Sequence, residues 1–198
     1  MNNFLNKLEV FIQKEFTEKS GRIFLFSLIF LFVIPLHISF LTWFFVFLFL
    51  TNMLGSDIKN KKFSLIISLP YSYAEVFFSS YIFSLLMILI PGTIGVAFIN
   101  FSAVTAFLNI LRALIFATAY YGVILISVTL GGDNFGIPFL ILLADLILGS
   151  FGSGYNVNPY RLISPYYQGN IWGSLIFSLV ILSLSLYLFE KRGVNKWL

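Results

Sequence analysis

Long runs of hydrophobic residues recur along the chain and define its predicted elements. Six stretches approach the length of about 20 residues that a helix needs to cross the hydrocarbon core of a membrane. They are residues 22–36, 38–54, 74–96, 106–130, 135–151 and 171–189. The first two form one apolar run broken by Pro35 and His37, and as a single helix this run would be about 50 Å long, against a core of about 30 Å. We expect two short helices there, with a shallow re-entrant hairpin as the alternative.

An amphipathic segment precedes the first of these stretches. Over residues 4–19, apolar side chains recur at helical spacing and charged side chains fill the opposite face. The apolar positions are Phe4, Leu5, Leu8, Phe11, Ile12 and Phe16. This pattern predicts a helix over residues 1–20 that lies in the membrane interface, with its apolar side among the lipids. A soluble amphipathic helix folded onto a partner is the alternative.

Two polar segments interrupt the hydrophobic pattern. Residues 55–73 begin polar and basic and continue into a short apolar stretch that ends at Pro70, which is typical of a short helix on the membrane surface. Ser72 stands three residues before Glu75, the spacing of a capping box that opens the next helix. Residues 152–170 carry two prolines and four tyrosines, as expected of a structured outer loop at the interface.

The composition excludes an ordinary soluble enzyme. Hydrophobic residues make up 59% of the 198 residues, charged residues only 10%, and the mean hydropathy is +0.96; an average soluble domain is about 25% charged. With no Cys and the single His37, disulfides, Cys nucleophiles and multi-His metal sites are excluded. The chain also lacks a G-x-x-x-x-G-K-[ST] loop, a G-x-S-x-G motif and an H-E-x-x-H motif, so we expect no catalysis, no metal and no cofactor of its own. We expect one all-α transmembrane domain over residues 1–198.

The positive charges predict the topology. Lys and Arg gather on the cytoplasmic side of membrane proteins. With six spans and both termini in the cytoplasm of the cell, ten of the twelve basic residues fall on that side, and only Arg112 and Arg161 do not. The net charge of +4 is therefore a topology signal, and no basic stripe interleaved with aromatics indicates nucleic acid.

Two ionisable residues lie at membrane depth, where such groups are costly and often functional. Asp145 lies near the middle of the fifth span and Arg112 in the outer half of the fourth. The two helices are consecutive and antiparallel, so the residues are candidates for an ion pair. Their depths differ by about 12 Å, however. This difference favours an Arg112 that extends outward and an Asp145 that faces a helix or subunit interface.

The loop that leads into the third span carries a recognisable motif. The run reads Ser68, Leu69, Pro70, Tyr71, Ser72, Tyr73, Ala74, Glu75, Val76. Preceded by a basic segment, it resembles the same region of ABC-2 type transporter permeases. The predicted architecture is also similar to that family: an amphipathic N-terminal helix, six spans, a tight turn between spans four and five and a long outer loop before span six. Many relatives carry a basic residue where Tyr73 stands and another near Ser80, and here the first two spans are short.

The resemblance implies a permease subunit that works with a separate ATP-binding cassette subunit, which holds the ATP and Mg²⁺, and with a second permease chain, either a copy of this one or a different chain. It implies that the loop over residues 55–73 is the coupling helix that contacts the ATPase. The residues expected in coupling are Asp57, Lys59, Lys61, Lys62, Phe63, Pro70, Ser72 and Glu75. The three lysines either pair with acidic residues of the ATPase or meet anionic lipid headgroups.

The function expected from this resemblance is export of an amphipathic or hydrophobic substrate, such as a peptide, a drug or a lipid, across the cell membrane. The abundance of Phe and Tyr suits such a cargo. The alternative is an ion- or proton-coupled secondary transporter in which Asp145 titrates, although no internal repeat links residues 22–96 with residues 106–189. A membrane scaffold or sensor that transports nothing is a third possibility.

Overall fold

Every element that the computed structural model describes is a helix. The described residues are 2–36, 39–60, 71–98, 102–151 and 158–196. The helices are α1 (Asn2–Leu36), α2 (Ser39–Thr51), α3 (Leu54–Lys59), α5 (Tyr73–Val96), α6 (Ala103–Thr129), α7 (Gly136–Ser150), α8 (Pro159–Ile163) and α9 (Ile171–Lys196). The prediction of an all-α chain is confirmed for these residues.

The lengths of the apolar helices indicate a multi-pass membrane protein. Among the described residues, four helices are long and apolar enough to cross a membrane: α1, α5, α6 and α9. Helices α2 and α7 are apolar but shorter, with apolar segments at Phe40–Thr51 and Gly136–Ser150. Each of the six predicted hydrophobic stretches thus contains a helix or part of one, and four of them belong to helices of spanning length, of which α1 reaches that length together with the charged segment from Phe4.

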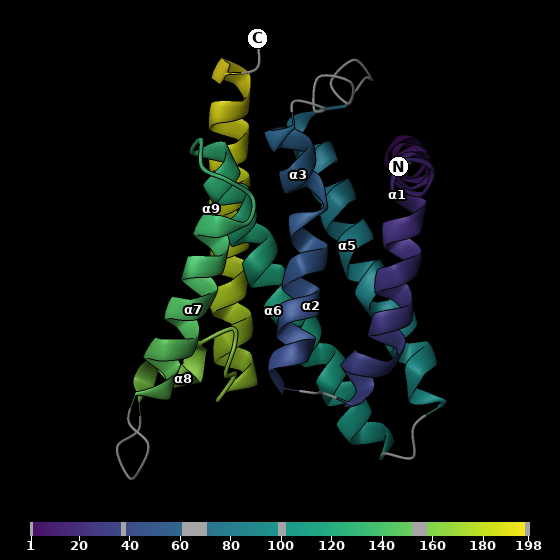
Figure 1. Ribbon diagram of the computed structural model, residues 1–198. Coiled ribbons are helices and arrows are strands. Elements are labelled where there is room, and N and C mark those ends of the chain that lie inside the picture. The colour runs from purple at the N-terminus through teal and green to yellow at the C-terminus, as the bar shows by residue number, and fades with distance from the viewer. Residues whose placement is uncertain (1, 37–38, 61–70, 99–101, 152–157, 197–198) are drawn as a thin grey trace. The chain divides into compact units, whose positions relative to one another are not determined.

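The chain divides into two compact units, Met1–Leu114 and Ile115–Leu198. The first half of α6 belongs to the first unit and its second half to the second unit. In the first unit, α1 runs alongside α5 (Figure 1). At the C-terminal end of α1, the buried amide of Asn109 on α6 donates a hydrogen bond of 2.9 Å to the carbonyl oxygen of Pro35.

Helix α1 joins the predicted interfacial segment to the first span. The two parts meet at a kink at Lys19, whose backbone has φ −123° and ψ 19°, outside the helical region. Ser20 and Gly21 follow directly, and Gly/Ser pairs are a common cause of sharp helix kinks because they stabilise the helical backbone poorly. The charged and apolar halves of α1 are therefore two helical segments with a joint between them.

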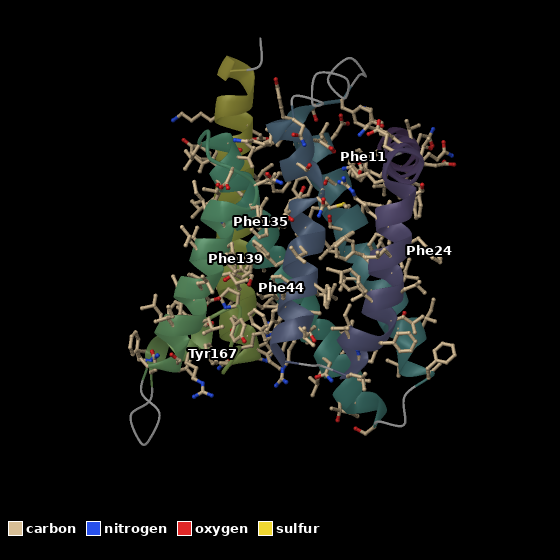
Figure 2. The ribbon with its side chains drawn as sticks, viewed as in Figure 1. Phe11, Phe24, Phe44, Phe135, Phe139 and Tyr167 are labelled. Atoms are coloured by element: carbon tan, nitrogen blue, oxygen red, sulfur yellow. The ribbon has the colours of Figure 1, made fainter. Side chains whose placement is uncertain are left out.

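Aromatic packing and one close backbone approach hold α1 against α5. Phe11 lies on the side of α1 that faces α5 (Figure 2), with its ring centroid 6.5 Å from that of Phe83. Further along, a Cβ added at Gly95 of α5 would overlap the carbonyl oxygen of Leu31. The two helices can reach this separation only because position 95 has no side chain.

In the second unit, α6 packs closely against α9, and a tight turn leads from α6 into α7. A Cβ added at Gly122 of α6 would lie 2.9 Å from the side chain of Ile181 on α9. In the turn, the carboxylate of Asp133 accepts hydrogen bonds from the backbone N–H groups of Gly136 (2.6 Å) and Ile137 (2.8 Å), which are otherwise unpaired at the start of α7. Asp133 therefore has a capping role.

Candidate functional site

A group of charged side chains joins the first half of α1 to α3. Its members, called the Asp57 cluster below, are Lys14, Glu15, Glu18, Lys19 and Asp57. The ammonium nitrogen of Lys19 lies 2.9 Å from Oδ2 of Asp57 and 2.8 Å from Oε2 of Glu15. Lys14 bridges the two glutamates, at 3.2 Å from Glu15 and 3.4 Å from Glu18.

The local sequence explains how this cluster forms. Lys14 precedes Glu18 by four residues and Glu15 precedes Lys19 by four residues, so each pair lies on one face of α1. Asp57 lies in the first turn of the short helix α3, where a negative charge is favoured by the helix dipole. The kink at Lys19 comes at the position of the side chain that contacts both carboxylates.

The Asp57 cluster is buried at its centre. The exposed fractions of Glu15 and Asp57 are 1% and 2%. Burial raises the pKa of the Asp57 carboxyl above its ordinary value, and the adjacent Lys19 ammonium opposes that shift. A buried charge that loses its partner destabilises a protein by about 3–5 kcal/mol, so the connection between α1 and α3 depends on Lys19.

A second ion pair joins the start of α1 to the start of α5. The ammonium of Lys7 lies 2.8 Å from both carboxylate oxygens of Glu75. The same carboxylate accepts the backbone N–H of Ser72, whose hydroxyl accepts the N–H of Glu75, so the predicted capping box is confirmed. The hydroxyl of Tyr71 donates a hydrogen bond of 2.7 Å to the carbonyl oxygen of Lys7. Glu75 therefore both caps α5 and binds α1.

The residues expected in coupling fall into two groups. Asp57, Ser72 and Glu75 have the contacts given above, and Lys59 is an exposed residue in the last turn of α3. The remaining four lie outside the described residues: Lys61, Lys62, Phe63 and Pro70. The sequence analysis did not identify Lys7 and Lys19 as partners of this loop. Their spacing from acidic residues on α1 was visible, but nothing in the sequence related them to positions 57 and 75.

Asp145 occupies a buried site in the second unit, and its exposed fraction is 4%. Its carboxylate accepts hydrogen bonds from the hydroxyls of Tyr120 (3.0 Å), Tyr160 (2.8 Å) and Ser164, and from the backbone N–H of Tyr166 (3.2 Å). These donors belong to α6, α8 and the turn after α8. These four donors replace the hydrogen bonds from water that the Asp145 carboxylate loses when it is buried.

The turn after α8 is packed against α7 near Asp145. A Cβ added at Gly149 would overlap the ring of Tyr167, and the Tyr167 hydroxyl donates a hydrogen bond of 3.0 Å to the carbonyl oxygen of Leu146 (Figure 2). Arg112 belongs to the first unit and is half-buried. That Arg112 extends outward and does not pair with Asp145 stays a prediction.

The described residues contain no group of three or more His, Asp or Glu side chains that could hold a metal ion. No family model, curated protein or solved structure matches this chain. The first unit contains two sets of ion pairs, which join α1 to Asp57 and to Glu75. The second unit contains, as a separate candidate, the buried carboxylate of Asp145 surrounded by neutral donors.

Proposed function

We propose that this chain is the permease subunit of an ATP-driven ABC-2 type exporter. In this proposal its six apolar helices all cross the cell membrane, both termini lie in the cytoplasm, and the substrate is an amphipathic or hydrophobic molecule. The motif around Pro70 and Glu75 and the order of the six helices support this assignment.

One observation carries the mechanism: the segment that an ATPase would push is joined to α1 at both of its ends. Asp57, at the start of the segment, pairs with Lys19, and Glu75, at its end, pairs with Lys7. A displacement of residues 57–75 then moves the charged half of α1 as well. The kink at Lys19 lies between that half and the part of α1 that crosses the membrane.

The resemblance to ABC-2 type permeases implies the partners of this chain. A separate ATP-binding cassette subunit holds ATP and Mg²⁺, and a second permease chain completes the transport path. In this proposal Lys59, Lys61 and Lys62 contact either acidic groups of the ATPase or anionic lipid headgroups. This chain supplies the path and the coupling segment, and its partner supplies the hydrolysis.

Purification of the full chain from its own membrane, followed by reconstitution with the ATP-binding subunit that accompanies it, tests the proposal. We expect that subunit in stoichiometric amount and an ATPase rate that changes when Lys61 and Lys62 are both replaced by Glu. Arg161→Gln, in the second unit, is the matched control and leaves the rate unchanged. Absence of the ATPase, or transport that continues without ATP, would refute the exporter.

A carrier coupled to Asp145 is the second candidate, because this carboxylate lines a cavity of about 110 Å³ together with Tyr120 and Tyr160. Such a carrier loses transport when a protonophore collapses the proton gradient and keeps it when ATP is depleted. The exporter has the opposite dependence. Asp145 already accepts four hydrogen bonds, which occupy most of the acceptor capacity of its carboxylate and favour a structural role for it over ion binding.

A further inference from the structure

A polar cavity of about 300 Å³ lies between the kink of α1 and the helix α3. Its charged lining residues are Glu18, Lys19, Arg22 and Asp57. Its volume is at the lower end of the range for ligand pockets, about 300–1,000 Å³, so it suits a small polar group. Neither the Asp57–Lys19 pair nor the exporter function requires such a cavity.

The lining carries two positive and two negative charges. Lys19 already contacts both Asp57 and Glu15, and Glu18 contacts Lys14. The guanidinium of Arg22 donates a hydrogen bond of 3.1 Å to the side-chain oxygen of Asn52, which is a neutral acceptor. Arg22 is exposed and has further N–H donors in its fork, so it can bind an anionic group at the cavity.

The position of the cavity along α1 indicates what reaches it. The first half of α1 is rich in charged residues, and from Ile23 to Leu36 no charged residue occurs. Arg22 therefore marks the boundary between the charged half and the part that is apolar enough to lie in the hydrocarbon. Phospholipid headgroups lie at this boundary, and their local concentration is high.

We propose that this cavity binds the phosphoethanolamine headgroup of a membrane lipid. The phosphate lies at Arg22 with the hydroxyls of Ser20 and Ser56 as further donors, and the ammonium lies at the carboxylates of Glu18 and Asp57. A lining with equal numbers of both charges matches a headgroup that carries one charge of each sign. An anionic headgroup such as phosphatidylglycerol can use Arg22 but has no ammonium that donates hydrogen bonds to the side-chain oxygens of Glu18 and Asp57.

A choline headgroup fits less well than ethanolamine. Trimethylammonium groups are bound over aromatic rings, and none of the described lining residues is aromatic. A primary ammonium donates hydrogen bonds to carboxylate and amide oxygens, and the lining offers Glu18, Asp57 and Asn60 as acceptors. The cavity therefore distinguishes ethanolamine from choline by hydrogen bonding.

The experiment measures which lipids stay bound to the full chain. The protein is incorporated into bilayers of equal parts phosphatidylethanolamine, phosphatidylcholine and phosphatidylglycerol, extracted in mild detergent, and its retained lipids are quantified by native mass spectrometry. We expect phosphatidylethanolamine to be retained at least about 3-fold above each of the others. Arg22→Gln removes this enrichment, whereas Arg161→Gln, which removes an equal charge from an exposed residue outside the lining, keeps it.

A second variant tests the charge pattern itself. Glu18 is exposed, so Glu18→Gln leaves the fold intact while giving the lining a net positive charge. We expect the preference to shift from phosphatidylethanolamine towards phosphatidylglycerol. Equal retention of all three lipids by the wild-type protein, or an equal loss of enrichment in Arg22→Gln and Arg161→Gln, would overturn the site. Lipid retention is measured independently of ATP-dependent transport, so these outcomes would refute the lipid site without refuting the exporter function.

Discussion

The hydroxyl of Tyr120 on α6 donates a hydrogen bond of 3.0 Å to the carboxylate of Asp145 on α7, and both residues are buried. Tyr160 and Ser164 donate to the other carboxylate oxygen. One acidic side chain thus joins α6, α7 and the segment after α8.

Asp145→Ala will destabilise the second unit. The substitution leaves the hydroxyl of Tyr120 and that of Ser164 without their acceptor, and a buried unsatisfied donor costs about 1–3 kcal/mol. We expect a loss of about 2–4 kcal/mol, measured by thermal unfolding in detergent. Tyr120→Phe should cost about 1 kcal/mol, and its effect should shrink in the Asp145→Ala background, which has no acceptor at this position. Equal effects of Tyr120→Phe in both backgrounds would contradict the hydrogen bond.

Lys19→Met will destabilise the Asp57 cluster in a manner that depends on pH. At neutral pH it leaves buried carboxylates without their ammonium, at a cost of about 3–5 kcal/mol. Because burial places the folded-state pKa of Asp57 above its unfolded value, protonation of Asp57 favours the folded state. The stability that Asp57 contributes is thus greatest at a pH below its pKa in the unfolded chain, and it is lost as the pH rises through its pKa in the folded protein.

The measurement for Lys19→Met is the unfolding midpoint between pH 5 and pH 8. The variant should regain stability on acidification to a greater extent than the wild-type protein. Lys59 is an exposed residue of α3, so Lys59→Gln serves as the control and should show the same dependence of the unfolding midpoint on pH as the wild-type protein. A variant whose loss of stability is the same at every pH would show that Asp57 is not the group left uncompensated.

Gly95→Ala will separate α1 from α5. The added Cβ would overlap the carbonyl oxygen of Leu31, which belongs to the backbone and cannot move away by rotating a side chain. Overpacking of this kind costs about 1–3 kcal/mol. Gly21→Ala is the matched control, because a Cβ there has no atom within 4 Å, and it should be neutral or slightly stabilising. Thermal unfolding of both variants gives the comparison.

Exchange of the charges between Lys7 and Glu75 tests whether this pair transmits movement. Lys7→Glu alone places two negative charges together and should reduce ATP-dependent transport in the reconstituted complex. The double variant Lys7→Glu with Glu75→Lys restores the attraction and should recover most of that transport. Full transport in the single variant, or no recovery in the double variant, would separate this ion pair from coupling.

The features that sequence analysis predicts well depend on short-range patterns. The six helices follow from hydrophobic length, and the capping box follows from Ser72 and Glu75, which are three residues apart. The joint at Lys19 lies next to the predicted boundary between the amphipathic segment, residues 1–20, and the first apolar stretch, which begins at residue 22. This boundary is visible in the sequence because the charged residues stop at Arg22.

The partners of Asp145 were not predictable for a different reason. If the partner of Asp145 is expected to carry the opposite charge, Arg112 is the candidate on the preceding span. The observed donors are neutral, and Tyr120 and Ser164 lie 25 and 19 residues away in the chain. Hydroxyl groups are common in this sequence, so no single one can be recognised as a partner of Asp145 before the arrangement of the helices is known. The same holds for Lys19 and Asp57, which are 38 residues apart.

Asn109 gives α1 an unusual set of attachments. The C-terminal end of α1 is held through the hydrogen bond to Pro35, and its N-terminal half is held through the ion pairs of Lys7 and Lys19. Only 22% of the most apolar stretch of the helix is buried. Because α1 is held at both of its ends, it cannot slide along α5. A force applied to its N-terminal half therefore bends α1 or rotates that half about the kink at Lys19, and the lipid on the exposed side of the helix adjusts to this movement.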